Sequence, residues 1–562
     1  MIRTVGIGIQ NFEKLITENS FYVDKTDFIR QWWENRDEVT LITRPRRFGK
    51  TLNMNMLERF LSVEYAGQGD IFERLSIWKE EKYRNLQGTW PVIFLSFADV
   101  KANTFALARE KICLLIKEVY HKFDFLLADG ILREGETDFF RNVLTEMTES
   151  EAAYSLKNLS GYLSRYYGKR VIILLDEYDT PLQEAWVYGY WQEMVELIRG
   201  LFNSTFKTNP YLERAVMTGI TRVSKESIFS DLNHLTVVTA TSEMYAACFG
   251  FTEEEVFAAL DEYRMQDKCT EVKKWYDGFT FGKCKDIYNP WSIINYLKTG
   301  RLSTYWANTS SNGLVDKLIR EGNAETKISM ENLLKGEHLY KEIDEQIIFE
   351  QLDMDENAIW SLFLTCGYLK AEGYALNEET GVDLYELALT NKEVQIMFRR
   401  MIKKWFSGSG TVYNGFIRAM LQDDVKSMNA YMNRVALATF SYFDSGKNPS
   451  METQPERFYH GFVLGLTVEL TDRYIITSNR ESGFGRYDVM MEPKNEADNA
   501  VIMEFKVREP QEESLEDTAD AALDQIEKQQ YEAALIHRGI SGERIRKYGF
   551  AFEGKEVLIK GL

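Results

Sequence analysis

The stretch VTLITRPRRFGKT (Val39–Thr51) places an apolar run directly before a basic loop that ends in Gly-Lys-Thr. The run is typical of a parallel strand that is buried on both faces. The residues that follow, LNMNMLERFLS (Leu52–Ser62), have the apolar spacing of a helix. A strand, a loop and a helix in this order form a P-loop, in which backbone N–H groups and the helix N-terminus bind phosphate. The sequence therefore predicts an ATP site at this loop.

The second half of this loop is expected to bind the nucleotide, through Arg46, Arg47, Phe48, Gly49, Lys50 and Thr51. The Lys50 ammonium is placed to reach the β- and γ-phosphates, and the Thr51 hydroxyl is placed to ligate Mg²⁺. The loop departs from the usual pattern because Arg44 occupies the position of the first glycine, and Pro45 follows it. Proline lacks an N–H donor, and arginine disfavours the backbone that glycine permits. We therefore expect a remodelled phosphate cradle, with Arg46 or Arg47 supplying side-chain charge.

A second apolar run, VIILLDEYD (Val171–Asp179), ends in adjacent acids. Asp176 at the strand end is expected to contact Mg²⁺, and Glu177 to polarise the attacking water as general base. After the run AVMTGI, the polar residues Thr218, Thr221 and Arg222 are candidate sensors of the γ-phosphate. A solvated acidic turn and a polar strand exit are the alternatives for these positions. The order of the two motifs favours nucleotide binding and, with less support, hydrolysis.

The N-terminal part of the chain alternates apolar runs with helical stretches, which predicts a doubly wound parallel α/β sheet. Five such strands are expected, at residues 39–43, 92–97, 171–175, 215–220 and 235–239. We predict a P-loop domain at residues 1–245, a helical lid and connector at residues 246–444, and a compact α/β domain at residues 456–562. The linker before the last domain is expected at Ser445–Pro455, which combines Gly, Pro, Ser and Asn.

In the C-terminal part, GRYDVMME supplies Asp488 on one strand, and VIMEFKV supplies Glu504 and Lys506 on the next. Residues two apart on a strand project to one face, so Glu504 and Lys506 share a side, and Asp488 on the neighbouring strand can join them. Two carboxylates and the Phe505 carbonyl would hold Mg²⁺ or Mn²⁺, and Lys506 would orient or deprotonate water. A cross-strand ion pair is the alternative. The αβββαββ order of elements favours a nuclease site.

Two helices flank these strands and offer further side chains. Glu456, at the start of the first helix, is a candidate additional metal ligand, and Gln525, on the helix after Lys506, a candidate contact to water or phosphate. A position on the helix surface without a ligand is at least as common for each. The spacing of the histidines does not support a zinc site.

Composition limits the class of partner. The formal net charge is −19, so the positive surface of a strong nonspecific nucleic-acid binder is lacking, and any contact with DNA or RNA is expected to be local or assisted by metal. The five cysteines are scattered without a CxxC pair, which is typical of reduced thiols in a cytoplasm. We find no apolar segment long enough to span a membrane and no signal peptide.

These motifs together carry a family resemblance. The chain resembles bacterial AAA-ATPase-like proteins that end in a PD-(D/E)XK nuclease-superfamily domain. FYVDKTDFI, RPRRFGKT, LLDEYDTPL, TGITRVSKESIFSDLN and WYDGF are similar to the ATPase-like part, and ERFYHGFVLGL, GRYDV and MEFKV to the nuclease-like part. The resemblance covers essentially the whole chain, and the arginine at position 44 agrees with it. It implies that Asp488, Glu504 and Lys506 are the nuclease residues.

Two functions follow from these expectations. In the first, ATP binding controls a metal-dependent phosphodiesterase that acts on nucleic acid. In the second, the chain is an NTPase signalling switch, and its nuclease-like domain serves as a binding module for nucleic acid or protein. A purely structural ATP is a third possibility, and an oligomer is compatible with all of them.

Overall fold

The computed structural model describes residues 2–128, 130–222, 228–229, 232–309, 313–344, 356–378, 381–405, 410–443, 453–482, 485–508, 514–553 and 556–562. The chain divides into two compact units. Unit 1 comprises Met1–Thr309 and Tyr340–Val394, and unit 2 comprises Ser310–Leu339 and Gln395–Leu562. None of the helices in the described ranges is long and apolar enough to cross a membrane.

Unit 1 is built on a parallel sheet whose strand order is β2-β3-β4-β1-β5. Its strands are β1 (Val39–Thr43), β2 (Val92–Ser96), β3 (Val171–Asp176), β4 (Leu212–Gly219) and β5 (Leu235–Val238). The five predicted strands are confirmed, and β4 begins earlier than predicted. Its early residues carry Arg214, whose guanidinium donates to the Trp33 carbonyl at 2.7 Å and so hides a charge inside a strand.

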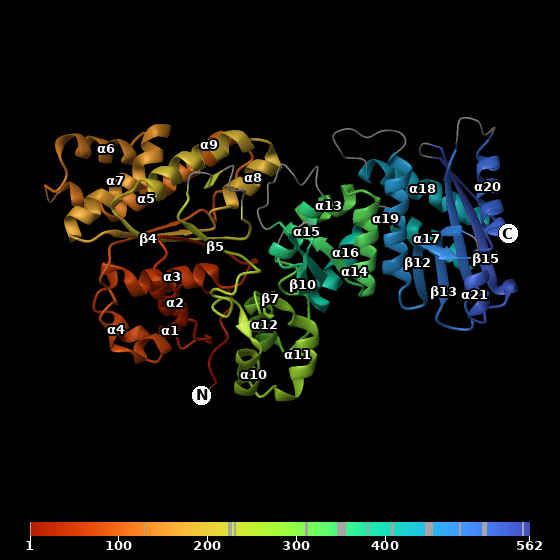
Figure 1. Cartoon of the computed structure of the whole chain (residues 1–562), viewed down its shortest axis with the longest axis horizontal. Coiled ribbons are helices and arrows are strands. Elements are labelled where there is room, and N and C mark those ends of the chain that lie inside the picture. The colour runs from red at the N-terminus through yellow and green to blue at the C-terminus, as the bar shows by residue number, and fades with distance from the viewer. Residues whose placement is uncertain are drawn as a thin grey trace. The chain divides into compact units, whose positions relative to one another are not determined.

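Helices cover both faces of this sheet (Figure 1). On one face lie α1 (Phe12–Thr17), α2 (Asp27–Asn35), α3 (Lys50–Leu61) and α4 (Glu81–Arg84). On the other face lie α5 (Phe105–Lys122), α6 (Glu134–Leu144), α7 (Glu149–Tyr167), α8 (Thr180–Tyr188) and α9 (Trp191–Phe202). The nearly continuous burial of β1 and β3 follows from this double cover, which is the reason their sequences are apolar throughout.

Two smaller sheets follow in unit 1. The first has the order β6-β8-β7 and contains β6 (Phe251–Thr252), β7 (Phe279–Phe281) and β8 (Cys284–Tyr288), with helices α10 (Glu253–Glu262), α11 (Cys269–Tyr276) and α12 (Pro290–Thr299). The second has the order β10-β11-β9 and contains β9 (Leu339–Glu342), β10 (Leu369–Asn377) and β11 (Val382–Leu389), preceded by α15 (Glu356–Thr365). We call residues 250–309 together with residues 356–394 the lid module.

The expectation of helices alone between Phe251 and Phe443 is therefore wrong. The strands of the first small sheet are too short to show a period, and those of the second lie in a hairpin, β10–β11, whose exposed face carries both polar and aromatic side chains. The predicted domain boundaries stay predictions.

Unit 2 contains a mixed sheet of order β12-β13-β14-β15-β16, in which only the β14–β15 pair, among the described strands, is parallel. The strands are β12 (Tyr474–Ser482), β13 (Gly485–Pro493), β14 (Ala500–Val507), β15 (Ile545–Glu553) and β16 (Glu556–Gly561). Its helices are α13 (Gly313–Glu321), α14 (Ala324–Lys335), α17 (Gly410–Leu421), α18 (Val425–Phe443), α19 (Thr453–Leu470), α20 (Leu515–Lys528) and α21 (Ala533–His537). The predicted αβββαββ order is confirmed from α19 onward, while residues 445–452 of the predicted linker lie outside the described ranges.

The chain passes between the two units three times, and the last passage lies within one helix, α16 (Lys392–Trp405). Its first residues, through Val394, belong to unit 1, and the rest belong to unit 2.

Candidate functional site

The C-terminal ends of β1, β4 and β3 meet at one edge of the unit 1 sheet. The register places Thr43 beside Gly219, and Leu175 beside Met217. Because the strands are parallel, the chain leaves all three at this edge. The loop after β1 therefore emerges beside Asp176, the last residue of β3, and α3 begins after that loop at Lys50.

Thr51 and Thr218 hold the Asp176 carboxylate from two sides. The Thr51 hydroxyl donates to Asp176 Oδ2 at 2.8 Å, and the Thr218 hydroxyl donates to Asp176 Oδ1. Burial raises the pKa of Asp176, whereas the two hydroxyl donors lower it. The structure thus brings together the predicted Thr51, Asp176 and Thr218. Carboxylate and hydroxyl oxygens are ligands that Mg²⁺ prefers, so this donor set fits the ion.

Lys50 is buried at the start of α3 and points back into the loop. Its ammonium donates to the carbonyls of Arg44 and Pro45, each at 2.9 Å. Burial lowers the pKa of Lys50, while the nearby carboxylates, Glu177 first and then Asp179 and Asp176, raise it. A lysine held by two neutral carbonyls can exchange them for phosphate oxygens, which match its charge better.

Arg44 is turned away from the loop and is fully buried. Its guanidinium donates to the carbonyls of Thr43 at 2.8 Å and Thr239 at 2.7 Å, and lies 4.4 Å from the ring centre of Phe281. The backbone of Arg44 is not in the left-handed region, so no glycine is needed there. This explains how the loop tolerates the replacement. The left-handed positions fall at Arg47, with a φ of 64°, and at Gly49, with a φ of 82°.

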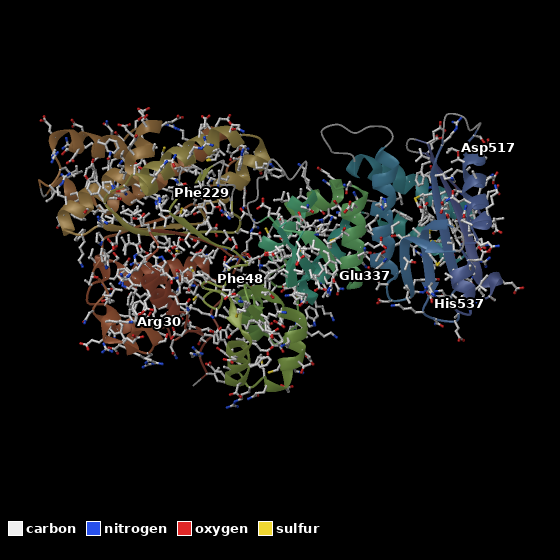
Figure 2. All side chains as sticks on the ribbon, in the orientation of Figure 1. Arg30, Phe48, Phe229, Glu337, Asp517 and His537 are labelled. Atoms are coloured by element: carbon white, nitrogen blue, oxygen red, sulfur yellow. The ribbon has the colours of Figure 1, made fainter. Side chains whose placement is uncertain are left out.

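The side chains of the remaining loop residues face either solvent or the lid module. The Arg46 and Arg47 side chains are exposed, and the Arg47 guanidinium lies 4.4 Å from the ring centre of Trp291. Phe48, labelled in Figure 2, is buried between Phe279 and Phe281 of β7, with ring centres 4.8 and 5.5 Å away. The Phe48 side chain therefore packs against protein. Only its backbone can contribute to the predicted nucleotide site.

Glu177 follows Asp176 with a left-handed φ of 51°. Its side chain is half-buried and accepts a hydrogen bond from the Thr180 hydroxyl at 3.3 Å. Its negative charge raises the pKa of Lys50. A left-handed conformation at a non-glycine residue turns the side chain out of the direction that the strand would give it.

Asp179 is a site residue that the sequence analysis did not single out. It is buried, and its Oδ2 accepts hydrogen bonds from the N–H groups of Ile220 and Thr221 and from the Thr221 hydroxyl, at 2.8 to 2.9 Å. Asp179 thereby fixes the exit of β4, where Arg222 is half-buried. The repeated acid in DEYD was the signal that could have identified it.

In unit 2, Asp488 of β13 and Glu504 of β14 lie side by side. The Phe505 N–H donates to Asp488 Oδ2 at 2.8 Å, and the Asp488 N–H donates to Glu504 Oε2 at 3.3 Å. Burial, followed by the Asp488 charge, raises the pKa of Glu504 to about 8. A buried carboxylate and a half-buried one this close repel each other unless a proton or a cation is shared, so the pair fits a divalent ion.

Lys506 lies on the same strand, and its positive charge lowers the pKa of Glu504. It is half-buried, and its ammonium makes no hydrogen bond with any described residue. The Gln525 amide on α20 donates to Glu504 Oε1 and also to the Tyr531 hydroxyl, at 3.1 Å. Gln525 therefore joins the predicted site, and Tyr531 is an addition to it. Glu456 lies within α19, but its side chain is outside the described part of the structure.

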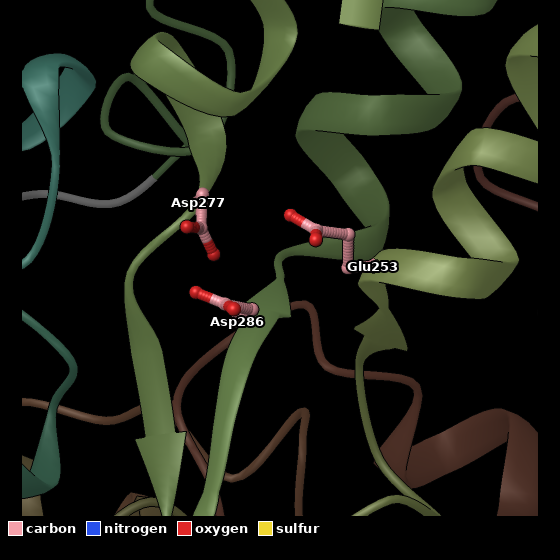
Figure 3. A group of neighbouring side chains, drawn as sticks. All are labelled: Glu253, Asp277 and Asp286. Carbon is pink, nitrogen blue, oxygen red and sulfur yellow. The ribbon is translucent and has the colours of Figure 1, made fainter. Parts of the chain in front are cut away.

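A separate group of carboxylates lies in the lid module (Figure 3). Glu253, Asp277 and Asp286 each place one oxygen within 4.8 Å of the others. Burial and the neighbouring Asp286 raise the pKa of Asp277 to about 7. Lys273 forms ion pairs with Glu253 and, at 3.6 Å, with Asp286. Because a lysine already supplies positive charge here, we assign this group to the packing of α10, α11 and β8.

The fold and the two sites define the class. Unit 1 is a parallel α/β sheet with a P-loop after β1, and the C-terminal sheet carries an Asp–Glu–x–Lys arrangement of the nuclease-like kind. Residues 6–229 match the family described as Predicted AAA-ATPase, and residues 454–561 match the PD-(D/E)XK nuclease superfamily. The chain therefore carries a domain of the predicted AAA-ATPase family and a C-terminal domain of the PD-(D/E)XK nuclease superfamily. The family resemblance drawn from the motifs is confirmed.

One relative extends along most of the chain. The "Uncharacterized protein in vnfD 5'region" of Azotobacter chroococcum mcd 1 is 24% identical over 502 residues. The match covers 84% of this chain and 85% of that protein, so the similarity extends over most of both chains.

Proposed function

We propose that the chain binds Mg²⁺ and ATP at the P-loop and hydrolyses the nucleotide. The observation that supports this most directly is the contact of Thr51 with Asp176 beside the buried Lys50. Thr51 and Asp176 would hold Mg²⁺, which would offset the charge of the phosphates. Glu177 is the proposed general base, and Lys50 the phosphate contact. Arg46, Arg47, Phe48 and Gly49 contribute loop backbone, while Thr218 orients Asp176 and Arg222 is the proposed sensor.

We also propose that the C-terminal domain cleaves phosphodiester bonds of DNA or RNA. Asp488 and Glu504 would hold Mg²⁺ or Mn²⁺, with Glu456 as a further ligand, and the ion would supply positive charge to the reacting phosphate. Lys506 would orient water or stabilise charge on the phosphate. Gln525 holds Glu504 in place through its amide.

The nucleotide state is proposed to control this second activity. The chain connects the two units through α16, and Glu393 in the first turn of that helix belongs to the same unit as the P-loop. A change in the lid module on nucleotide binding therefore has a continuous helical path into unit 2.

Charge supports the alternative, in which the nuclease-like domain is a binding module of an NTPase switch. Residues 451–562 contain 14 Lys and Arg against 22 Asp and Glu, a formal charge of −8. Such a domain binds a phosphate backbone weakly in the absence of divalent ions. The two functions differ in whether any nucleic acid is cut.

A cleavage assay separates them. Labelled single- and double-stranded DNA and RNA are incubated with Mg²⁺ or Mn²⁺, with and without ATP. We expect the wild type to cut at least one substrate, Lys506→Ala to lower the rate by at least about 100-fold, and Lys50→Ala to remove the effect of ATP. Lys528→Ala is the matched control because Lys528 is an exposed lysine of the same domain, paired with Asp524.

Each outcome decides one part of the proposal. If no substrate is cut in any nucleotide state, the nuclease proposal fails and the binding-module alternative is favoured. If the Lys50→Ala variant still cuts nucleic acid and its rate still responds fully to ATP, control through the P-loop is contradicted.

A further inference from the structure

The lid module contacts the P-loop backbone at one carbonyl. The Arg46 carbonyl accepts a hydrogen bond from Trp306 Nε1 at 3.0 Å and from Asn289 Nδ2 at 3.2 Å. Both side chains are buried, at 4% and 1% exposed. Two buried side-chain donors on a single loop carbonyl fix the direction of that carbonyl strongly, because turning it away would leave both donors without this acceptor.

The direction of this carbonyl determines the direction of the next N–H group. The Arg46–Arg47 peptide is trans and planar, so its C=O and N–H point in opposite directions. With the carbonyl directed at Trp306 and Asn289, the Arg47 N–H points away from the lid module. Within the described ranges this N–H donates to no protein group.

A second peptide of the loop is arranged in the same way. The Phe48 carbonyl accepts a hydrogen bond from the Gly250 N–H at 3.3 Å, and the Gly49 N–H, on the other side of that peptide, also has no acceptor among the described residues. The left-handed φ values of Arg47 and Gly49 produce this alternation. Successive N–H groups that face one side form an anion-binding concavity.

A buried carboxylate braces both donors of the Arg46 carbonyl. Glu393 accepts hydrogen bonds from the Ser292 hydroxyl at 2.8 Å and from the Ala307 N–H at 3.3 Å. Ser292 lies in the first turn of α12, which Asn289 caps through its Oδ1, and Ala307 follows Trp306. Glu393 therefore ties together the two segments that carry the donors.

We propose that Asn289 and Trp306 are positioning residues of the nucleotide site, which hold the Arg46–Arg47 peptide with its N–H directed at the phosphates of the bound nucleotide. This inference rests on the proposed nucleotide binding. The phosphate cradle of the ATPase domain is thus completed by residues of the lid module, outside the span 6–229 that matches the family.

The test compares two variants that remove a donor with one that does not. Trp306→Phe removes the Nε1 donor and keeps an aromatic ring, while Asn289→Ser keeps an oxygen that can cap α12 and removes the amide. Trp275→Phe is the control because Trp275 is a half-buried tryptophan of the same module, in contact with Tyr276 and Lys392. The full-length proteins are titrated with Mg²⁺ and ADP, and with adenosine, which has no phosphate. The melting temperature without nucleotide is measured for each protein.

We expect each of the two variants to bind ADP about 3- to 10-fold more weakly than the wild type, the loss of one hydrogen bond. The adenosine affinity of these two variants should change by less than about 2-fold, and so should the ADP affinity of the Trp275→Phe variant. Unchanged ADP affinity in both folded variants, or an equal loss for ADP and adenosine, overturns the inference. If Trp306→Phe does not fold, the result for Asn289→Ser decides. A wild type that binds no ADP contradicts the nucleotide site itself, which is a different result.

Discussion

Glu393 is the residue whose environment has the clearest consequence for stability. It is 1% exposed, and burial raises its pKa to about 7, while hydrogen bonds from Ser292 and from the backbone at Ala307 oppose that rise. The folded chain therefore holds the proton of this carboxyl more tightly than the unfolded chain does. Its stabilising contribution is fully present below the ordinary carboxyl pKa and is lost as the pH rises through about 7.

Replacing Glu393 with Gln removes this titration. From pH 5 to pH 8 the free energy of unfolding of the wild type should fall by up to about 3 kcal/mol because of this carboxyl, and Glu393→Gln should lack that fall. Urea denaturation at both pH values measures it. Glu254→Gln, at an exposed position of the same module, should run parallel to the wild type. Parallel curves for Glu393→Gln as well would contradict the buried, protonated carboxyl.

Local motifs identified some site residues, and distance in the chain hid others. Asp176 was predicted because it ends an apolar run, and Lys50 and Thr51 because they end the short loop that follows another such run. Trp306 and Asn289 gave no signal because their role depends on one carbonyl far away in the sequence. From the sequence, Arg44 showed only that the usual glycine is absent. Its burial against Thr239 and Phe281 could not be predicted because it depends on tertiary contacts.

At the scale of elements, the approach of the lid module to the P-loop depends on a glycine. Gly250 has a φ of 81°, and a Cβ there would lie 2.7 Å from Ile287 and 2.9 Å from the Phe48 ring. Gly189, at the C-terminus of α8, has a φ of 82° but open space around the same position. Substitutions at the two glycines therefore distinguish the cost of backbone strain from the cost of steric crowding.

Gly189→Ala should cost about 1 to 2 kcal/mol of stability, from the left-handed backbone alone. Gly250→Ala should cost about 2 to 5 kcal/mol because crowding against Phe48 adds to that strain. Thermal or urea unfolding of the two variants tests this difference. Equal losses of stability would mean that Phe48 moves aside freely and that the lid module does not restrict the loop at Gly250.

The sequence indicated the long elements better than the short ones. The strands of the main sheet were recognisable because helices cover both faces and most positions are apolar. The three residues of β7 carry no period that distinguishes a strand, although two of them, Phe279 and Phe281, enclose Phe48. The element that shapes the phosphate loop was therefore the one least visible in the sequence.

At the scale of the whole molecule, the division into two units predicts two unfolding transitions. Mg²⁺ and ATP at about 100 times the dissociation constant should stabilise the folded ATP-binding unit by about 2.7 kcal/mol. We expect calorimetry to show one transition raised by several degrees and the other unchanged, and Lys50→Ala to remove the shift. A rise in both transitions would mean that nucleotide binding also stabilises the other unit and would support communication between them.

The hydrogen bonds on the Arg46 carbonyl also have a consequence for biosynthesis. Their donors lie 243 and 260 residues later in the chain, beyond the whole of the main sheet. At about 5 to 20 residues per second, the ribosome needs roughly 10 to 50 seconds to reach them after it has made the loop. During that interval the parallel sheet can assemble while the loop peptide is not yet fixed. With the nucleotide site that we propose, the nascent chain would acquire its ability to bind nucleotide only after Trp306 has been made.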